Sequence, residues 1–255
     1  MLGKKEKLRY IDWLIRDKHP DFLAHPKKYL PLVEKDIKRL EAGEPLAYVI
    51  GWVDFLGARI DLSYKPLIPR VETEFWVGEA LRLIPNSKFS IHCLDLCAGS
   101  GCIGLAILKR LPNSKVVFAD NSPKAIGQIN KNLTINKIKK SRTRVVESSL
   151  FKNVKGKFDY IFTNPPYIPA GRKLPVSVKK YEPNSALFAG QDGLNLLKRI
   201  LREAPGHLSA NGLILFEFDS AQKNKLEKFM EQLPYRNVEF YKDQYGKWRY
   251  GRAKI

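Results

Sequence analysis

Apolar residues near the start of the chain recur at the period of amphipathic helices. In residues 8–15 and again in residues 30–40 they lie three or four positions apart, with charged residues between them. Prolines interrupt the pattern between the two segments, and Gly43 is suited to end the second helix. We therefore predict a small N-terminal helical domain over residues 1–43.

The pattern changes in residues 44–66, where aromatic and β-branched residues replace the helical period. Gly51 and Gly57 punctuate this stretch, as glycines do at the turns between short strands. We predict a β-hairpin linker here, between the helical domain and the rest of the chain.

Beyond residue 90, short apolar strands alternate with amphipathic helices. This alternation is typical of a mostly parallel sheet covered by helices, and two consecutive strands at the end of the chain favour an antiparallel edge. The predicted strands are residues 91–96, 115–120, 143–147, 158–163, 212–218, 236–241 and 247–254, and the predicted helices are residues 103–111, 123–136, 194–203 and 221–232.

Composition is that of a globular protein, but the charge is unusual. The 255 residues are 44% hydrophobic and 28% charged, which excludes a disordered or fibrous chain. The 45 Lys and Arg residues against 26 Asp and Glu residues give a net charge of +19. Such a balance favours contact with RNA, DNA or an acidic protein, although many enzymes are simply basic.

The three cysteines, Cys93, Cys97 and Cys102, predict neither a disulfide framework nor a metal site. Their C-x3-C-x4-C spacing does not match a zinc pattern, and an odd number of cysteines favours a reducing compartment. The first residues lack the apolar stretch of a signal peptide, and no window approaches 18 apolar residues. We expect a cytoplasmic protein without a membrane span or a metal.

A glycine-rich turn at residues 95–101 follows the first predicted strand of the sheet and opens a helix. Glycines there let the backbone approach a ligand, and the helix N-terminus offers free N–H groups. Asp120 ends the next strand, where a carboxylate can accept hydrogen bonds from both hydroxyls of a ribose. We predict an adenosine-containing cofactor. Because residues 99–104 also fit G-x-G-x-x-G, the glycines alone do not separate NAD from S-adenosylmethionine.

The tetrapeptide Asn-Pro-Pro-Tyr at residues 164–167 follows the fourth predicted strand and should lie at the same sheet edge. The Asn164 side-chain carbonyl and the Pro165 backbone carbonyl can each accept one N–H of a planar, conjugated –NH2 group. Such contacts orient the nitrogen lone pair toward a sulfonium methyl, and Tyr167 offers a ring face to the planar group. This chemistry favours methyl transfer, because a hydride-transferring enzyme has no obvious use for the tetrapeptide.

These motifs, with three further blocks, resemble the N5-glutamine methyltransferase family that modifies peptide chain release factors. The resemblance extends over residues 37–255. The further blocks are E-P-L-A-Y with Gly51 at residues 44–51, L-I-P-R-V-E-T-E at residues 67–74, and Y-E-P-N-S-A-L with the G-x-D-G-L segment at residues 181–194.

The resemblance implies an α/β fold of class I methyltransferase type, a Rossmann-like, mostly parallel seven-strand sheet, over residues 67–255, beside the small N-terminal helical domain. It implies S-adenosylmethionine as cofactor and the glutamine of the Gly-Gly-Gln loop of release factors as substrate. By motif position, the implied cofactor-binding residues are Cys97, Ala98, Gly99, Ser100, Gly101, Asp120, Ser149, Leu150 and Asn164. The implied catalytic residues are Asn164, Pro165 and Tyr167, and the implied substrate-binding residues are Asn164, Pro165, Pro166 and Tyr167.

The chain departs from the family pattern at five positions. Val71 replaces a proline, which would loosen its loop, and Cys97 stands where glycine is common. Ser149 stands where an Asp often follows the third strand, and Leu150 where a larger side chain is frequent. Phe218 follows the glutamate of the fifth strand where glycine is usual. None of these changes removes Asn164 or Asp120.

Three other functions fit part of the pattern. An adenine N6-methyltransferase acting on DNA or RNA would act on the same kind of –NH2 group, and the positive charge favours it. It would have to extrude the base, and the chain has no spare segment for a DNA-recognition domain. The others are a nicotinamide-dependent enzyme and a non-catalytic binding module. Direct nucleic-acid binding is possible for a release-factor enzyme but is not required.

Two groups of basic residues bear on partners. The run at residues 137–144 is interpreted as a solvated helix end rather than a nucleic-acid patch. Arg172, Lys173, Lys179 and Lys180 follow the Asn-Pro-Pro-Tyr loop and could steer an acidic partner toward the substrate mouth. Glu217 could orient the active-site loop or only cap a neighbouring helix.

Overall fold

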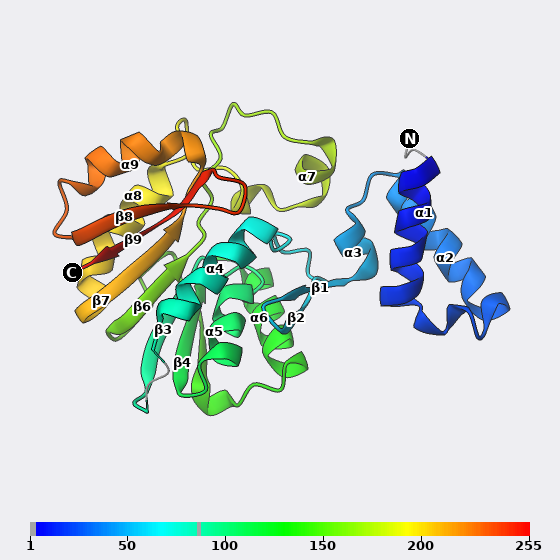
Figure 1. Cartoon of the computed structure of the whole chain (residues 1–255), viewed down its shortest axis with the longest axis horizontal. Coiled ribbons are helices and arrows are strands. Elements are labelled where there is room, and N and C mark those ends of the chain that lie inside the picture. Colours follow the sequence, from blue (N-terminus) through cyan, green and yellow to red (C-terminus); the bar gives the residue numbers. More distant parts are fainter. Residues whose placement is uncertain (1–3, 86–87) are drawn as a thin grey trace.

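The computed structural model describes residues 4–85 and 88–255, in which a seven-stranded sheet forms the centre of the molecule (Figure 1). The strand order is β5-β4-β3-β6-β7-β9-β8, and only β9 runs against its neighbours. The predicted mostly parallel sheet with an antiparallel C-terminal edge is therefore confirmed. The strands are β3 (Ile91–Leu96), β4 (Ser114–Asp120), β5 (Thr143–Glu147), β6 (Phe158–Thr163), β7 (Leu208–Glu217), β8 (Arg236–Lys242) and β9 (Trp248–Lys254).

Helices cover both faces of this sheet and create two apolar layers. Helices α4 (Val71–Leu83), α5 (Cys102–Arg110) and α6 (Pro123–Ile135) pack on one face, with Phe118 and Phe162 between them and the strands. Helices α8 (Asn195–Glu203) and α9 (Lys223–Met230) cover the other face. The near-continuous apolar strands follow from this double burial, because neither face of a central parallel strand meets water.

The sequence pattern missed helix α4. Phe75, Trp76 and Val77 are three consecutive apolar residues, of which Trp76 and Val77 are fully buried and Phe75 is partly buried. A helix that is apolar around much of its circumference does not show the i, i+3, i+4 period on which the prediction relied.

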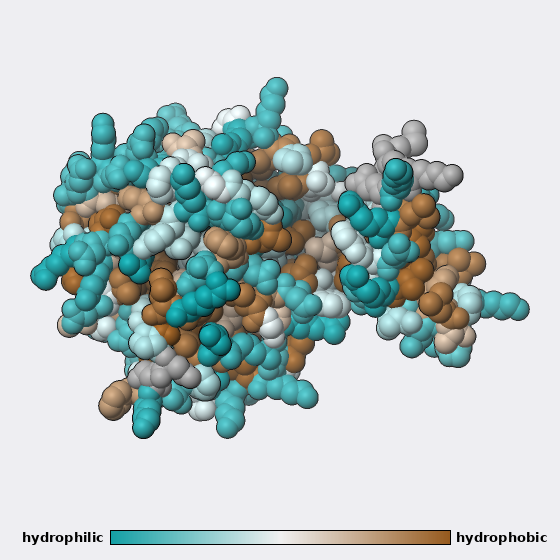
Figure 2. Space-filling view, in the orientation of Figure 1, coloured by the Kyte–Doolittle hydropathy of each residue, from teal (hydrophilic) through white to brown (hydrophobic). Residues whose placement is uncertain are grey.

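The N-terminal segment folds into helices that stand to one side of the sheet (Figure 1). They are α1 (Lys4–Trp13), a π-helical turn (Leu14–Lys18), a 3-10 turn (Pro20–Phe22) and α2 (Pro26–Glu41), and the first three residues of the predicted domain lie outside the described ones. Their small core centres on Leu14, Leu40 and Val49. Leu8 and Leu30, the first residues of the two predicted apolar faces, are exposed, and Figure 2 shows apolar surface over these helices.

Residues 44–66 contain a short helix, α3 (Leu46–Ile50), before the predicted hairpin of β1 (Trp52–Phe55) and β2 (Ala58–Asp61). The hairpin is fastened to α6 by side-chain amides. Asn132 accepts from the Asp61 N–H at 2.8 Å and donates to the Ser100 carbonyl at 2.9 Å. The linker therefore contacts the same helix that supports the glycine-rich turn.

In residues 4–85 and 88–255, no helix has both the length and the apolar character needed to cross a membrane. The same residues contain no cluster of three or more His, Cys, Asp or Glu side chains that could hold a metal ion.

Candidate active site

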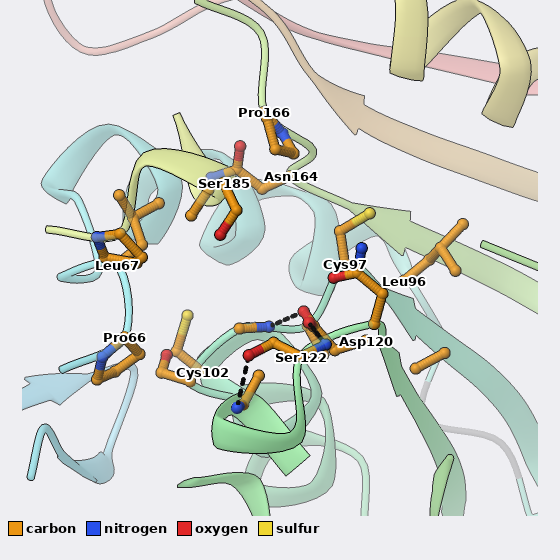
Figure 3. Close-up of a pocket in the computed structure, with 18 of the residues that line it drawn as sticks. Pro66, Leu67, Leu96, Cys97, Cys102, Asp120, Ser122, Asn164, Pro166 and Ser185 are labelled. Atoms are coloured by element: carbon orange, nitrogen blue, oxygen red, sulfur yellow. Dashed lines mark hydrogen bonds between the residues drawn. The ribbon is translucent and has the colours of Figure 1, made fainter. Parts of the chain in front are cut away.

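Two adjoining cavities open at the carboxyl ends of β3, β4 and β6. This is the edge at which open α/β sheets bind their ligands. The first, called the larger cavity here because many more residues line it, has about 1230 Å³ of empty space when its open mouth is included. Figure 3 shows Asn164 and Asp120 on opposite sides of it, with Cys97 on one wall and Leu67 on the wall facing it.

The glycine-rich turn after β3 depends on backbone conformations that L-residues rarely adopt. Cys97, Gly99 and Gly101 have φ values of +58°, +55° and +78°. The glycine that the family often has at the position of Cys97 has a physical reason, because only glycine adopts such a φ without strain. Gly104 has a different role: a Cβ there would lie 2.2 Å from the Phe118 ring, so this glycine lets α5 pack against β4.

Asp120 ends β4 and anchors this turn. Its Oδ2 accepts from the Gly99 N–H at 2.9 Å and its Oδ1 from the Ser122 N–H at 2.9 Å. Burial raises the pKa of this carboxyl, and the backbone N–H donors oppose that shift. Each oxygen has a second lone pair, so the pair can also accept from two adjacent hydroxyls. The donor set at Asp120 thus fits a ribose.

Most of the residues expected to hold the cofactor meet in the larger cavity. Gly101 is the exception: it is absent from the wall and shapes the turn from behind. A Cβ at Gly101 would lie 3.2 Å from the side chain of Ile129. The expected residues that line the cavity are Cys97, Ala98, Gly99, Ser100, Asp120, Ser149, Leu150 and Asn164.

The smaller cavity encloses about 690 Å³ of empty space and has a mostly apolar wall from the loop after β6, helix α7 (Val176–Tyr181) and the segment before α4. Pro165 and Tyr167 line it, whereas Pro166 lies on the wall of the larger cavity. Asn164 lines both, together with Leu67, Arg70 and Ala186. Asn164 is therefore the residue of the tetrapeptide that stands where the two cavities meet.

A buried hydrogen-bond network lies behind Asn164. Its Nδ2 donates to Thr73 Oγ1 at 3.2 Å, and the Thr73 hydroxyl donates to Glu217 Oε2 at 2.7 Å. Trp76 Nε1 donates to the same carboxylate oxygen at 2.7 Å, and the Tyr167 hydroxyl donates to Glu217 Oε1 at 2.9 Å. Thr73 and Trp76 come from α4, which the sequence pattern missed.

Burial dominates the electrostatics of this network. It raises the pKa of Glu217, and the hydrogen bonds from Trp76, Thr73 and Tyr167 oppose the shift. The pKa of Tyr167 is raised well above its usual value, first by burial and then by the neighbouring Glu217 carboxylate. Tyr167 therefore keeps its proton and remains a donor to Glu217. Of the two roles considered for Glu217, the contacts favour orientation of the loop.

The blocks at residues 67–74 and 181–194 contact each other around the smaller cavity. Arg70 Nη2 lies 2.6 Å from Glu182 Oε1, and Glu182 Oε2 accepts from the Ile68 N–H at 3.1 Å. Gly193 lies so close to the tetrapeptide that a Cβ there would be 2.1 Å from the Tyr167 carbonyl oxygen. The Gln222 amide donates to that carbonyl at 2.8 Å. These contacts fix the loop that carries Asn164.

The family model described as "Methyltransferase small domain" matches residues 80–180. A protein of Borreliella burgdorferi named "Release factor glutamine methyltransferase" is 38% identical over 231 residues, 88% of this chain and 79% of that protein. A protein of Lactococcus lactis with the same name is 32% identical over 95% of this chain and 88% of that protein. The chain belongs to the release factor glutamine methyltransferase family.

The fold of this release factor glutamine methyltransferase family member is also that of known methyltransferase structures. The Thermus thermophilus 16S rRNA N2 G1207 methyltransferase, solved with AdoMet and guanosine, superposes with a TM-score of 0.56. It is 18% identical, and the match covers 80% of this chain and 49% of that one. The sheet is thus the class I methyltransferase sheet, as predicted, and S-adenosylmethionine is the cofactor of this enzyme family.

The basic residues considered for partner binding divide into two kinds. Arg142, within the run at residues 137–144, donates to the carbonyls of Leu108 and Leu111 at 2.9 and 2.8 Å and so caps the end of α5. Arg172 forms a salt bridge with Asp219 beside the tetrapeptide loop. Lys179 and Lys180 lie in the last turn of α7. Arg142 is therefore structural, whereas the lysines of α7 remain candidates for a partner.

Proposed function

We propose that this protein transfers a methyl group from S-adenosylmethionine to the side-chain amide nitrogen of the glutamine in the Gly-Gly-Gln loop of peptide chain release factors. The observation that carries the proposal is the position of Asn164 at the junction of two cavities, one suited to a nucleoside and one mostly apolar. The names of the relatives support the same reaction.

In this proposal the larger cavity holds S-adenosylmethionine, which supplies an electrophilic methyl group on its sulfonium. Asp120 accepts from the ribose hydroxyls, and the backbone of Cys97, Ala98, Gly99 and Ser100 surrounds the amino acid end, with Gly101 shaping the turn. Ser149 and Leu150 border the adenine. The polar backbone and the single carboxylate fit a cationic amino acid nucleoside.

Asn164 and Pro165 hold the glutamine amide. Its nitrogen is a weak nucleophile, because its lone pair is delocalised into the carbonyl. The Asn164 Oδ1 and the Pro165 carbonyl each accept one N–H, which orients the lone pair and helps the nitrogen to become pyramidal. A side-chain base is not required before the transfer, since the proton is lost readily once the nitrogen is cationic.

Tyr167 and Pro166 complete the pocket in this proposal. The Tyr167 hydroxyl is fixed on Glu217, so its ring has a defined orientation at the wall of the smaller cavity. A fixed aromatic face can pack against the planar glutamine amide. Pro166, on the wall of the larger cavity, stiffens the backbone between Asn164 and Tyr167.

We propose that the chain has three parts, the helical segment 1–43, the linker 44–66 and the methyltransferase domain 67–255, with the linker packed on the methyltransferase domain. The only partner required is the release factor, which places the enzyme in the cytoplasm with the translation machinery. Lys173 and Lys179 are the chain neighbours of Leu174 and Val178, which line the smaller cavity. With Lys180 they would steer acidic groups of the substrate toward it.

The test is a methyl-transfer assay with labelled S-adenosylmethionine. Purified release factor, its variant with the Gly-Gly-Gln glutamine changed to Ala, and a mixture of adenine-rich RNA and DNA are offered in parallel. We expect label in the release factor alone, and none in its variant. Label confined to the nucleic acid would overturn the proposal, support adenine N6-methylation, and give the net charge of +19 a direct role.

A further inference from the structure

Thr73 lies next to Asn164 on the wall of the larger cavity, and it is absent from the wall of the smaller one. Its side chain is 2% exposed, and its hydroxyl connects Asn164 Nδ2 to the buried carboxylate of Glu217. The proposed reaction assigns Thr73 no part. Because the reaction depends on which end of the Asn164 amide faces the substrate, the directions of these hydrogen bonds matter.

The donors in the network fix those directions. The Trp76 indole nitrogen can only donate, so Glu217 Oε2 must accept from it. The Tyr167 hydroxyl contacts the other carboxylate oxygen at 2.9 Å. Three donors surround Glu217 and the charge of Arg249 lies near it, and all of them favour the ionised carboxylate, which accepts on both oxygens. The Thr73 hydroxyl therefore donates its only proton to Glu217.

Because its proton is donated to Glu217, Thr73 Oγ1 can only accept from Asn164. The atom of Asn164 that faces Thr73 must then be the NH2 group, at 3.2 Å, and Oδ1 must point the other way. The reversed amide would place Oδ1 against the lone pairs of Thr73 and would present two donors to the substrate. The glutamine nitrogen that reacts also presents donors, so the reversed orientation could not accept its N–H.

We propose that Thr73, oriented by Glu217, is a positioning residue that sets the orientation of the Asn164 amide and so presents its Oδ1 as an acceptor to the substrate N–H. The inference rests on the proposed function and deepens it. It also gives a role to the threonine of the E-T-E block at residues 72–74, which α4 brings to the same carboxylate oxygen as Trp76.

The test is Thr73→Val, which keeps the shape of the side chain and removes the acceptor, with Thr73→Ser as the variant that restores it. We expect Thr73→Val to lower kcat by about tenfold to a hundredfold, while KM for the release factor and the dissociation constant for S-adenosylhomocysteine change by less than about threefold. Thr73→Ser should stay within about threefold of the wild-type kcat.

Thr163→Val is the matched control. Thr163 is fully buried and adjacent to Asn164, but its hydroxyl donates to the Leu96 carbonyl at 2.9 Å and not to Asn164. The Thr163→Val change removes a threonine hydroxyl that is as buried as that of Thr73. We therefore expect a comparable fall in Tm, with kcat within about threefold of wild type. A loss of kcat in Thr73→Val but not in Thr163→Val separates positioning from general destabilisation.

A second measurement, NMR spectroscopy, reports on the side-chain amide of Asn164 itself. The side-chain NH2 signals of Asn164, identified by their absence from the Asn164→Ala spectrum, should shift in Thr73→Val and return in Thr73→Ser. Should Thr73→Val not fold, Thr73→Ala carries the same expectations. A folded Thr73 variant with wild-type kcat and unshifted Asn164 signals would overturn the inference. An inactive wild type on release factor would overturn the proposed function instead, and the spectra would still test the amide orientation.

Discussion

The two halves of the site are constructed by different means. The cofactor side is built mainly from backbone: three residues with positive φ between Cys97 and Gly101, and N–H groups that anchor Asp120. The substrate side is built from side chains that come together only on folding. Thr73 and Glu217 are 144 residues apart, and Arg70 and Glu182 are 112 apart. Local backbone geometry thus defines one half, and tertiary packing defines the other.

The largest effect should come from the residue that belongs to both halves. We expect Asn164→Ala to lower kcat by about 10³-fold or more, because it removes the acceptor that orients the glutamine nitrogen. Binding of S-adenosylhomocysteine should stay within about tenfold, since the glycine-rich turn and Asp120 are untouched. Turnover by labelled methyl transfer and a thermal shift with S-adenosylhomocysteine measure both. Retained turnover would contradict the proposed mechanism.

A change on the substrate side alone should reduce activity through packing. Gly193→Ala places a Cβ 2.1 Å from the Tyr167 carbonyl oxygen at a φ of +74°, so the loop carrying Asn164 must move. We expect the free energy of unfolding to fall by roughly 2 kcal/mol and kcat to fall by about tenfold to a hundredfold.

Gly171→Ala is the control for this change, because Gly171 lies in the loop that carries Asn164, with open space around it and no positive φ. Its Tm and kcat should match those of the wild type. Equal effects of the two glycine changes would show that the close approach of Gly193 to the tetrapeptide has no part in positioning it.

A change on the cofactor side should give the opposite pattern. Asp120→Asn keeps the shape of the side chain but replaces one acceptor oxygen by a donor. We expect the affinity for S-adenosylhomocysteine to fall by about tenfold, with kcat at saturating cofactor within about threefold of wild type. Calorimetric titration and saturation kinetics separate the two quantities. A fall in kcat without a fall in affinity would contradict the division of the site.

The pH dependence of cofactor binding should follow the same carboxyl. Burial raises the pKa of Asp120 above its usual value of 3.8. The ionised form accepts from the ribose, so affinity should be full at neutral pH and should fall as the pH drops through that raised pKa. Titrations from pH 8 downward should show this loss in the wild type and a weaker dependence in Asp120→Asn.

The difference between the two halves also explains what the sequence could predict. Asp120 and the glycine-rich turn lie within a short stretch, and their chemistry follows from their order after a strand. The seven strands could be predicted because apolar runs bounded by turns are a local signal. The roles of Thr73 and Trp76 could not be predicted in this way, because α4 lacks a clear helical period. Their partner Glu217 also lies more than 140 residues further along the chain. Proximity across a fold has no local signature.

The smallest effect concerns Val71, where the chain departs from the family's proline. The loss of proline at this position predicts a looser loop. Val71 is the first residue of α4 and is exposed, and Arg70 before it is extended, at φ −94° and ψ 148°. Proline suits the first helical position, and an extended residue can precede it.

We therefore expect Val71→Pro to raise the free energy of unfolding by about 0.4–1 kcal/mol, by restricting the unfolded chain, with kcat unchanged within about twofold. Thermal unfolding at fixed protein concentration measures the gain. Since Thr73 follows two residues later, a Val71→Pro protein that is more stable but has a lower kcat would mean that the start of α4 must yield for Thr73 to reach Asn164. An unchanged kcat means that α4 already holds Thr73 in place, as the substrate side of the site requires.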